Sequence, residues 1–115
     1  MSEEQTTPFL TVMVERQAPW AIVRLSGELD HQSHPDLADH LRSLLNEMDP
    51  PRIGVDLNGL QFCDSSGIAC LVMAWKVARE RRGALVLLRP TEEAARLLSL
   101  IGLAAVVPVV DELPG

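Results

Sequence analysis

A strand and a helix meet in the sequence Asp56-Leu-Asn-Gly-Leu-Gln-Phe-Cys-Asp-Ser-Ser-Gly67. Residues 53–57 form the short apolar run of a buried strand, and residues 66–82 are expected to form a long, very apolar helix. The carboxylate and the two hydroxyls at positions 64–66 therefore lie at a helix N-terminus. Backbone N–H groups at such an end have no partner within the helix and carry partial positive charge.

On both sides of this junction, the hydrophobic pattern predicts five strands and three helices in the order ββαβαβαβ. The predicted strands are residues 9–15, 20–25, 53–57, 84–88 and 104–110, and the predicted helices are residues 35–49, 66–82 and 91–101. The first two strands should form an antiparallel hairpin, and the helices between the later strands indicate crossovers to parallel pairing. The last strand should lie at an edge of the sheet because Pro108 cannot donate a ladder hydrogen bond.

This order predicts a single α/β domain with a mixed β-sheet and its helices on one face. Residues 1–8 are expected to be a mobile N-terminal tail, and residues 111–115 a C-terminal tail. The apolar face of the third helix is expected to consist of Ala94, Leu97, Leu98 and Ile101.

Composition narrows the classes of function. The 115 residues suit one domain, and the apolar fraction of 47% argues against disorder. A net charge of −6 argues against nucleic-acid binding through phosphate neutralisation. Residues 1–8 are too polar for a secretory signal, and no apolar run reaches the roughly 18 residues of a membrane span. We therefore expect a soluble cytoplasmic protein that does not bind membranes, with Cys63 and Cys70 as buried thiols.

The cluster at positions 64–66 has an ordinary interpretation, in which one residue simply caps the helix. Two features favour more than a cap. Three candidates stand together, and residues 65–75 contain no Glu, Lys or Arg, so part of that surface is expected to face a partner. A phosphate on either serine would add about −1.5 to −2 charges, which a helix N-terminus tolerates but an apolar contact does not. The cluster is therefore suited to a phosphorylation switch, on Ser65 or on Ser66.

Three motifs carry a resemblance to a known family: Leu57-x-Gly59-Leu60-x-Phe62-x-Asp64-Ser65-Ser66-Gly67-Ile68, Leu25-Ser-Gly-Glu-Leu-Asp-His31 and Leu100-Ile-Gly-Leu103. Together they resemble the STAS domain and, more narrowly, the bacterial anti-sigma factor antagonists. The motifs occur in the family's order, and the resemblance covers residues 9–110. It implies a STAS-like fold for the whole domain.

The resemblance also implies a function and assigns roles to residues. An anti-sigma factor that is itself a GHKL-type serine kinase phosphorylates the position of Ser65, and a PP2C-type phosphatase removes the phosphate. The unphosphorylated antagonist binds the anti-sigma factor and releases the sigma factor, whereas the phosphorylated form does not bind. The protein itself would need no cofactor, since ATP and Mg²⁺ belong to the kinase. The supporting residues of the phosphorylation site would be Asp64, Ser66 and Gly67.

The partner-binding surface is expected beside this serine. The resemblance places Asp30 and His31 on it, and the apolar start of the helix adds Ile68 and Ala69. Ala69 stands where the family often has glycine. Cys63 stands where the family often has methionine.

Two other kinds of site compete with this interpretation. A metal site would use residues whose spacing matches no recognised ligand pattern: Asp30, His31, His34, Asp36 and His40. A serine hydrolase would need a Gly-x-Ser-x-Gly elbow with a base and an oxyanion hole, but Ser65 lies in Cys-Asp-Ser-Ser-Gly. We therefore expect no metal site, no catalytic residue and no enzymatic activity.

The stronger alternative is a STAS domain that serves as a binding module without a kinase. Examples are the soluble subunit of a lipid-transport ABC complex and a stress-signalling scaffold. Such a module would share the fold and could retain the serine.

Overall fold

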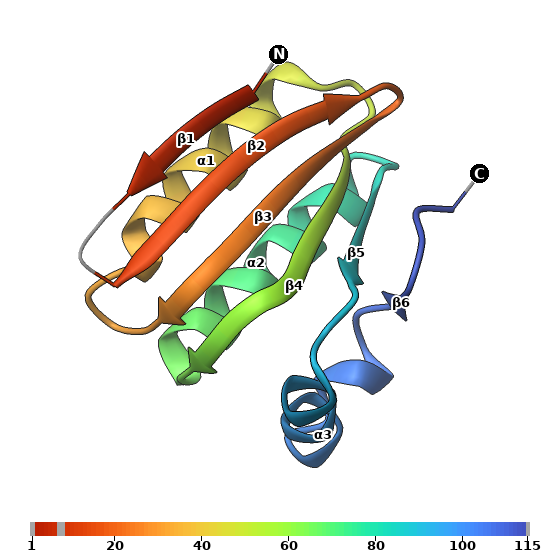
Figure 1. Ribbon diagram of the computed structural model, residues 1–115. Helices are drawn as coiled ribbons and strands as arrows, with labels where there is room; N and C mark the ends of the chain where they lie inside the picture. Colours follow the sequence, from red (N-terminus) through yellow and green to blue (C-terminus); the bar gives the residue numbers. More distant parts are fainter. Residues whose placement is uncertain (1, 7–8, 115) are drawn as a thin grey trace.

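The computed structural model describes residues 2–6, for which only the backbone is considered, and residues 9–114. Its elements are shown in Figure 1: β1 (Ser2–Thr6), β2 (Leu10–Gln17), β3 (Trp20–Leu29), α1 (His34–Glu47), β4 (Arg52–Cys63), α2 (Ser65–Glu80), β5 (Ala84–Leu88), α3 (Glu92–Leu100), the 3₁₀ turn η1 (Leu103–Ala105) and β6 (Val109–Val110).

The strands form one mixed sheet in the order β1-β2-β3-β4-β5-β6. The pairs β1–β2 and β2–β3 are antiparallel, and the three pairs from β3 to β6 are parallel. Helices α1 and α2 lie side by side on one face of this sheet (Figure 1). The predicted α/β fold with a mixed sheet and helices on one face is therefore confirmed.

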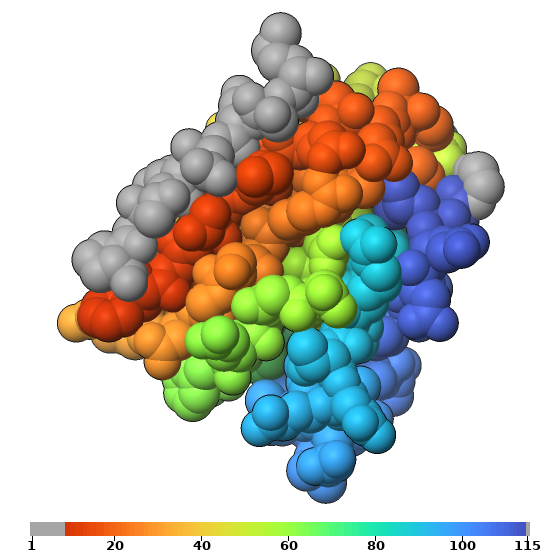
Figure 2. All heavy atoms as spheres, viewed as in Figure 1, coloured from red at the N-terminus to blue at the C-terminus, as the bar shows by residue number. Residues whose placement is uncertain are grey.

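The main core lies between the sheet and the helices, because each element turns its apolar side chains toward the same layer. Leu41 of α1, Leu71 of α2 and Val55 of β4 are almost completely buried there. The opposite face of the sheet, seen from the front in Figure 2, carries no helix within the described part of the chain. At one end of that face Trp20 and Leu88 belong to a smaller buried cluster, against which Leu113 packs.

The two ends of the chain differ from the sequence-based expectation. Residues 1–8 were expected to be a tail, but residues 2–6 form β1 and pair with β2, while residues 1, 7 and 8 lie outside the described residues. This strand has a polar sequence and is specified by the open backbone edge of β2, which leaves no apolar pattern to detect. Residues 111–114 contain no helix or strand, as expected, and residue 115 is outside the described residues.

The expected strand at 104–110 is also wrong in its extent. The turn η1 occupies residues 103–105, and only Val109–Val110 pair with β5. Gly102, with φ of 81°, directs the chain from α3 into this turn, and Pro108 contributes only its carbonyl, which accepts from the Leu87 N–H at 2.8 Å. The strand β6 does lie at an edge of the sheet, as predicted from Pro108.

The strands β3 and β4 are longer than predicted, and their extra length positions the site. They remain paired in parallel as far as Leu29 opposite Cys63, with two shifts of register on the way. Because parallel strands end at the same edge of the sheet, the loop after β3 and the start of α2 meet there. The polar residues 26–29, expected as a loop, belong to this extension.

Candidate functional site

Asp64 organises the start of α2. It is the N-cap residue, and its Oδ1 accepts hydrogen bonds from the backbone N–H groups of Ser66 at 2.9 Å and Gly67 at 3.2 Å. Its Oδ2 accepts from the N–H of His31 at 3.0 Å. One carboxylate thus caps the helix and fastens the loop after β3 to it.

Ser65 is the first residue of α2, and its side chain is exposed. Among the described residues, none forms a hydrogen bond with its hydroxyl. Ser66 differs, because it is half-buried and faces the groove between α1 and α2. The geometry therefore favours Ser65 as the serine whose hydroxyl another protein can reach.

Gly67 fits a position with no space for a side chain. A Cβ here would lie 2.6 Å from Cγ of Leu29 and 2.9 Å from Sγ of Cys63. The start of α2 is therefore pressed against the ends of β3 and β4, which holds the backbone beside Ser65 in place.

The loop after β3 is held by its own polar groups. Asp30 Oδ1 accepts from the N–H groups of Gln32 at 3.0 Å and Ser33 at 2.9 Å, and the buried Ser33 hydroxyl donates to the Glu28 carbonyl at 2.8 Å. The hydrogen bond from the Ser33 N–H is the main cause that lowers the pKa of Asp30. His31 is exposed beside Asp64, whereas the Asp30 carboxylate serves mainly to hold this loop.

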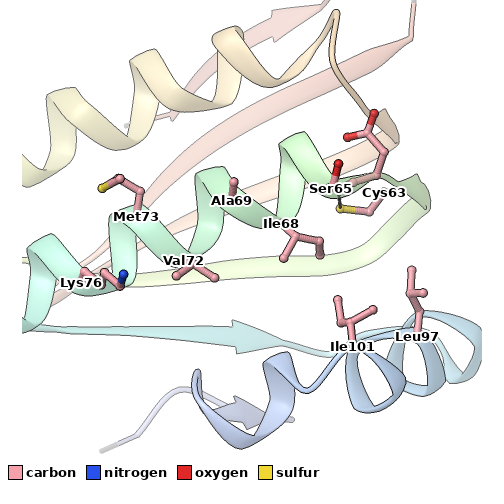
Figure 3. A pocket seen from close by; sticks show the side chains of 10 residues that line it. Cys63, Ser65, Ile68, Ala69, Val72, Met73, Lys76, Leu97 and Ile101 are labelled. Carbon is pink, nitrogen blue, oxygen red and sulfur yellow. Dashed lines mark hydrogen bonds between the residues drawn. The ribbon is translucent and has the colours of Figure 1, made fainter.

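An apolar groove of about 620 Å³ opens beside Ser65, between α2 and α3 (Figure 3). It is lined by Cys63, Asp64, Ser65, Ile68, Ala69, Val72, Met73, Lys76, Leu97 and Ile101. In Figure 3, Leu97 and Ile101 point from α3 toward α2. The structure thus brings Ser65, Ile68 and Ala69 together as the sequence predicted.

One wall of this groove was not predicted from the sequence. Leu97 and Ile101 belong to the predicted apolar face of the third helix, but they are 38% and 48% exposed, and of that face only Leu98 is buried. Periodicity identifies the apolar side of a short helix but not which of its residues contact the core. The spacing of four residues between Leu97 and Ile101 places both side chains on the same side of the helix, and this was the sign in the sequence that they form one surface.

A second groove, of about 660 Å³, lies on the other side of α2, against α1. His31, His34, Arg42 and Arg81 stand around it, and Ala69 and Met73 border both grooves. Helix α2 therefore forms a ridge between a basic groove and the groove that contains Ser65.

The two cysteines are half-buried rather than fully buried. Burial, with a smaller contribution from the Asp64 carboxylate, raises the pKa of the Cys63 thiol to about 12. Burial also raises the pKa of Cys70. Both thiols are therefore protonated at neutral pH and are poor nucleophiles.

Within the described residues, no group of three or more His, Cys, Asp or Glu side chains is placed to hold a metal ion. In the same part of the chain, no helix is both long and apolar enough to cross a membrane.

Comparison with known proteins finds a matching family model and two similar proteins whose function is named. The family model described as "Mlab, STAS domain" matches residues 12–110. An anti-sigma F factor antagonist of Paenibacillus polymyxa is 29% identical over 89% of this chain and 87% of its own length. A protein of the same name from Lysinibacillus sphaericus is 27% identical over 83% of this chain and 80% of its own length.

Among solved structures, the chain is similar to an anti-sigma factor antagonist from Mycobacterium paratuberculosis. The TM-score is 0.81 at 23% identity, and the match covers 95% of this chain and 92% of the other. At this identity the likeness shows a shared fold.

Proposed function

This chain belongs to the STAS family, and we propose that it is an anti-sigma factor antagonist controlled by phosphorylation of Ser65. In its unphosphorylated form it binds an anti-sigma factor through the surface around Ser65, and the sigma factor is released. The anti-sigma factor is also a GHKL-type serine kinase that phosphorylates Ser65, which ends the binding. A PP2C-type phosphatase restores the active form, and the protein works in the cytoplasm of a bacterium.

One observation supports this proposal most strongly. The Ser65 hydroxyl is exposed and unbonded among the described residues, at the edge of an apolar groove. The neighbouring carboxylate of Asp64 already accepts three backbone N–H groups. It therefore fixes the start of α2, and with it the position of the acceptor serine. The curated relatives named as anti-sigma F factor antagonists supply the class of partner.

The chemistry needs little from this chain. The γ-phosphoryl group of ATP moves to Oγ of Ser65, the P–O bond to ADP breaks, and the hydroxyl proton leaves to a base of the kinase. ATP and Mg²⁺ belong to the kinase. The antagonist contributes the hydroxyl, a rigid helix start and a docking surface, so it has no cofactor and no catalytic residue of its own.

The switch acts on the interface and not on the fold. A phosphate at the first residue of α2 lies at the positive end of the helix dipole, which tolerates its charge although the Ser66 and Gly67 N–H groups already donate to Asp64. The same charge would have to lose its water where an apolar partner surface closes over the groove. Phosphorylation therefore removes binding while the domain stays folded.

Binding measurements with designed variants test the proposal. We expect Ser65→Asp to weaken binding to the cognate anti-sigma factor at least about ten-fold, because an unpaired charge enters the interface. Its free energy of unfolding should change by less than about 0.5 kcal/mol. Isothermal titration calorimetry against the anti-sigma factors encoded in the same genome, together with chemical denaturation, measures both quantities.

Ser66→Ala is the matched control, because it removes the neighbouring hydroxyl and keeps Ser65. Incubation with the anti-sigma factor, ATP and Mg²⁺ should add one phosphate to this variant and to the natural chain, but none to Ser65→Ala, by intact-mass analysis. A phosphate that persists in Ser65→Ala would disprove the assignment to Ser65. Failure of every anti-sigma factor to bind the unphosphorylated chain would disprove the proposed function.

A second candidate function has one observation in its favour. The family model that matches this chain carries the description Mlab, not that of an anti-sigma factor antagonist. The chain would then be a STAS module that binds its partner permanently, as in the soluble subunit of a lipid-transport ABC complex. In that case Ser65→Asp would not regulate binding, and no kinase would phosphorylate the chain.

A further inference from the structure

The groove between α2 and α3 extends well beyond the immediate surroundings of Ser65. It runs along α2 from Ser65 to Lys76, and Leu97 and Ile101 of α3 form its second wall. The exposed fractions are 62% for Met73, 38% for Leu97 and 48% for Ile101. Such large apolar side chains gathered in one open groove indicate a surface that another molecule covers.

The charges of the groove are unequal at its two ends. Asp64 lies beside Ser65, and its carboxylate is already bonded to backbone N–H groups. Lys76 lies at the other end, and it forms no ion pair with any residue between 9 and 114. A partner that fills the groove therefore gains most from an acidic group placed at Lys76.

The walls of the groove also restrict the backbone of whatever fills it. Both walls are helices, whose backbone groups are already bonded, so the groove offers no open strand edge. An extended peptide would leave its N–H and C=O groups unpaired against apolar side chains. A helix bonds its own backbone and presents only side chains, so a helix fits this groove.

We propose that this groove receives an amphipathic helix of the anti-sigma factor, with an acidic side chain of that helix paired to Lys76. This inference rests on the proposed function and names the element of the partner that docks. The twelve residues from Ser65 to Lys76 span about 16 Å along α2, at about 1.5 Å for each of the eleven steps between them, which corresponds to about three turns of the docked helix. Two copies of this chain facing each other through the groove would be two concave surfaces and would not fill it.

Photo-cross-linking locates the partner segment. The photoreactive residue p-benzoylphenylalanine is placed at position 97, in the α3 wall, or at position 42, beside the other groove. The unphosphorylated chain is irradiated with the anti-sigma factor that binds it, and the cross-linked peptides are sequenced by mass spectrometry. We expect position 97 to cross-link one helical segment that contains an acidic residue, and position 42 to cross-link that segment at least about five-fold less, because the two positions lie on opposite sides of α2.

A charge exchange then tests the pairing. Lys76→Glu should weaken binding about ten-fold, because two like charges then face each other. Replacing the acidic residue of the cross-linked segment by lysine should restore the affinity of Lys76→Glu to within about three-fold of the natural pair. Arg79→Glu is the matched control, because Arg79 lies outside the groove and stacks on Trp75, and it should leave binding nearly unchanged.

Several results would overturn the inference while the proposed function stands. These are binding without a cross-link at position 97, a cross-link there to a second copy of this chain, and equal losses for Lys76→Glu and Arg79→Glu. An extended segment at position 97 would also overturn it. Absence of any binding by the unphosphorylated natural chain would instead refute the proposed function.

Discussion

Two carboxylates, Asp56 within β4 and Asp64 at the start of α2, are stabilised in different ways. Asp56 is 4% exposed on the open face of the sheet; its Oδ2 lies 2.5 Å from Nη2 of Arg89 and 3.5 Å from Nε of Arg24. Asp64 accepts only backbone N–H groups, and no cationic side chain forms an ion pair with it within the described residues. The first arrangement neutralises a charge inside the domain, whereas the second leaves the surroundings of Ser65 without a compensating cation.

This difference has a consequence for the switch. A phosphate on Ser65 would be balanced mainly by the helix dipole, since the Ser66 and Gly67 N–H groups already donate to Asp64 and the nearest cation of the groove, Lys76, lies three turns away. Its charge would therefore stay available to repel an apolar partner. If Ser65 lay beside paired arginines like those at Asp56, the same phosphate would be neutralised within the chain.

The largest expected effect on stability is at Asp56. Asp56→Ala should lower the free energy of unfolding by about 2–3 kcal/mol, because Arg89 and the Asn58 N–H lose their acceptor and Arg24 keeps only its ion pair with Glu15. We place the cost below that of a fully buried pair because both arginines are partly exposed to water. Urea denaturation followed by Trp fluorescence measures it.

Asp56→Asn is the matched control for this variant. It keeps an oxygen for the Asn58 N–H and removes only the charge, so it should cost less than Asp56→Ala. Binding to the anti-sigma factor should be unchanged in both variants, since Asp56 does not line the groove beside Ser65. If either Asp56 variant lost binding without losing stability, Asp56 would act at the partner interface and would not differ from Asp64 as we infer.

The contrast shows which parts of the site a sequence can reveal. Asp64 and Ser65 are adjacent, and a cap followed by an apolar helix is a local pattern, so their arrangement could be predicted. The hydrogen bond from the His31 N–H to Asp64 spans distant residues and depends on β3 and β4 staying paired to their ends. The predicted strands ended at residues 25 and 57, before the paired ends of β3 and β4, because residues 26–29 and 58–63 are partly polar.

The missed elements share a physical cause. The strand β1 is polar and is specified by the backbone of β2, and the exposure of Leu97 depends on the groove that separates α3 from α2. In both cases the structure depends on the position of a neighbouring element, which the local sequence does not specify. The order of elements along the chain from β2 to α3 and the crossovers to parallel pairing were predicted from local sequence patterns, since these strands and helices bury apolar side chains at regular spacings.

A smaller effect is expected at Asp64. Asp64→Ala should cost about 1–2 kcal/mol, as the loss of an N-cap does. Thr91→Ala is the matched control: its Oγ1 caps α3 by accepting from the Ala94 N–H at 3.1 Å, and it holds no second loop. Chemical denaturation compares the two losses.

Hydrogen exchange separates the two roles of Asp64. The His31 amide should exchange faster in Asp64→Ala and unchanged in Thr91→Ala, because only Asp64 accepts from it. Unchanged protection of His31 in Asp64→Ala would mean that other contacts hold the loop, and the two carboxylates would then differ less than we infer.

The smallest expected effect uses Cys63 as a reporter of the Asp64 charge. Burial and Asp64 raise the pKa of this thiol to about 12, so the fraction of thiolate at pH 8 is about a thousand-fold lower than in the unfolded chain, where the pKa is about 9. Removing the neighbouring anion favours the thiolate. Asp64→Asn, which still caps the helix, should therefore speed alkylation of Cys63 by iodoacetamide about two- to five-fold, whereas Asp56→Asn should leave it unchanged.

Two controls distinguish a charge effect from local opening of α2. Opening would speed the alkylation of Cys63 and Cys70 together and leave the midpoint of the pH–rate curve in place, whereas loss of the Asp64 charge lowers the midpoint for Cys63. Because the native thiol binds its proton more tightly than the unfolded thiol, the contribution of Cys63 to stability is present below about pH 9 and falls as the pH rises toward 12. In Asp64→Asn this decline should be smaller, because the native pKa lies closer to 9. Equal rates in Asp64→Asn and Asp56→Asn would show that the charge beside Ser65 is as well compensated as the charge inside the sheet.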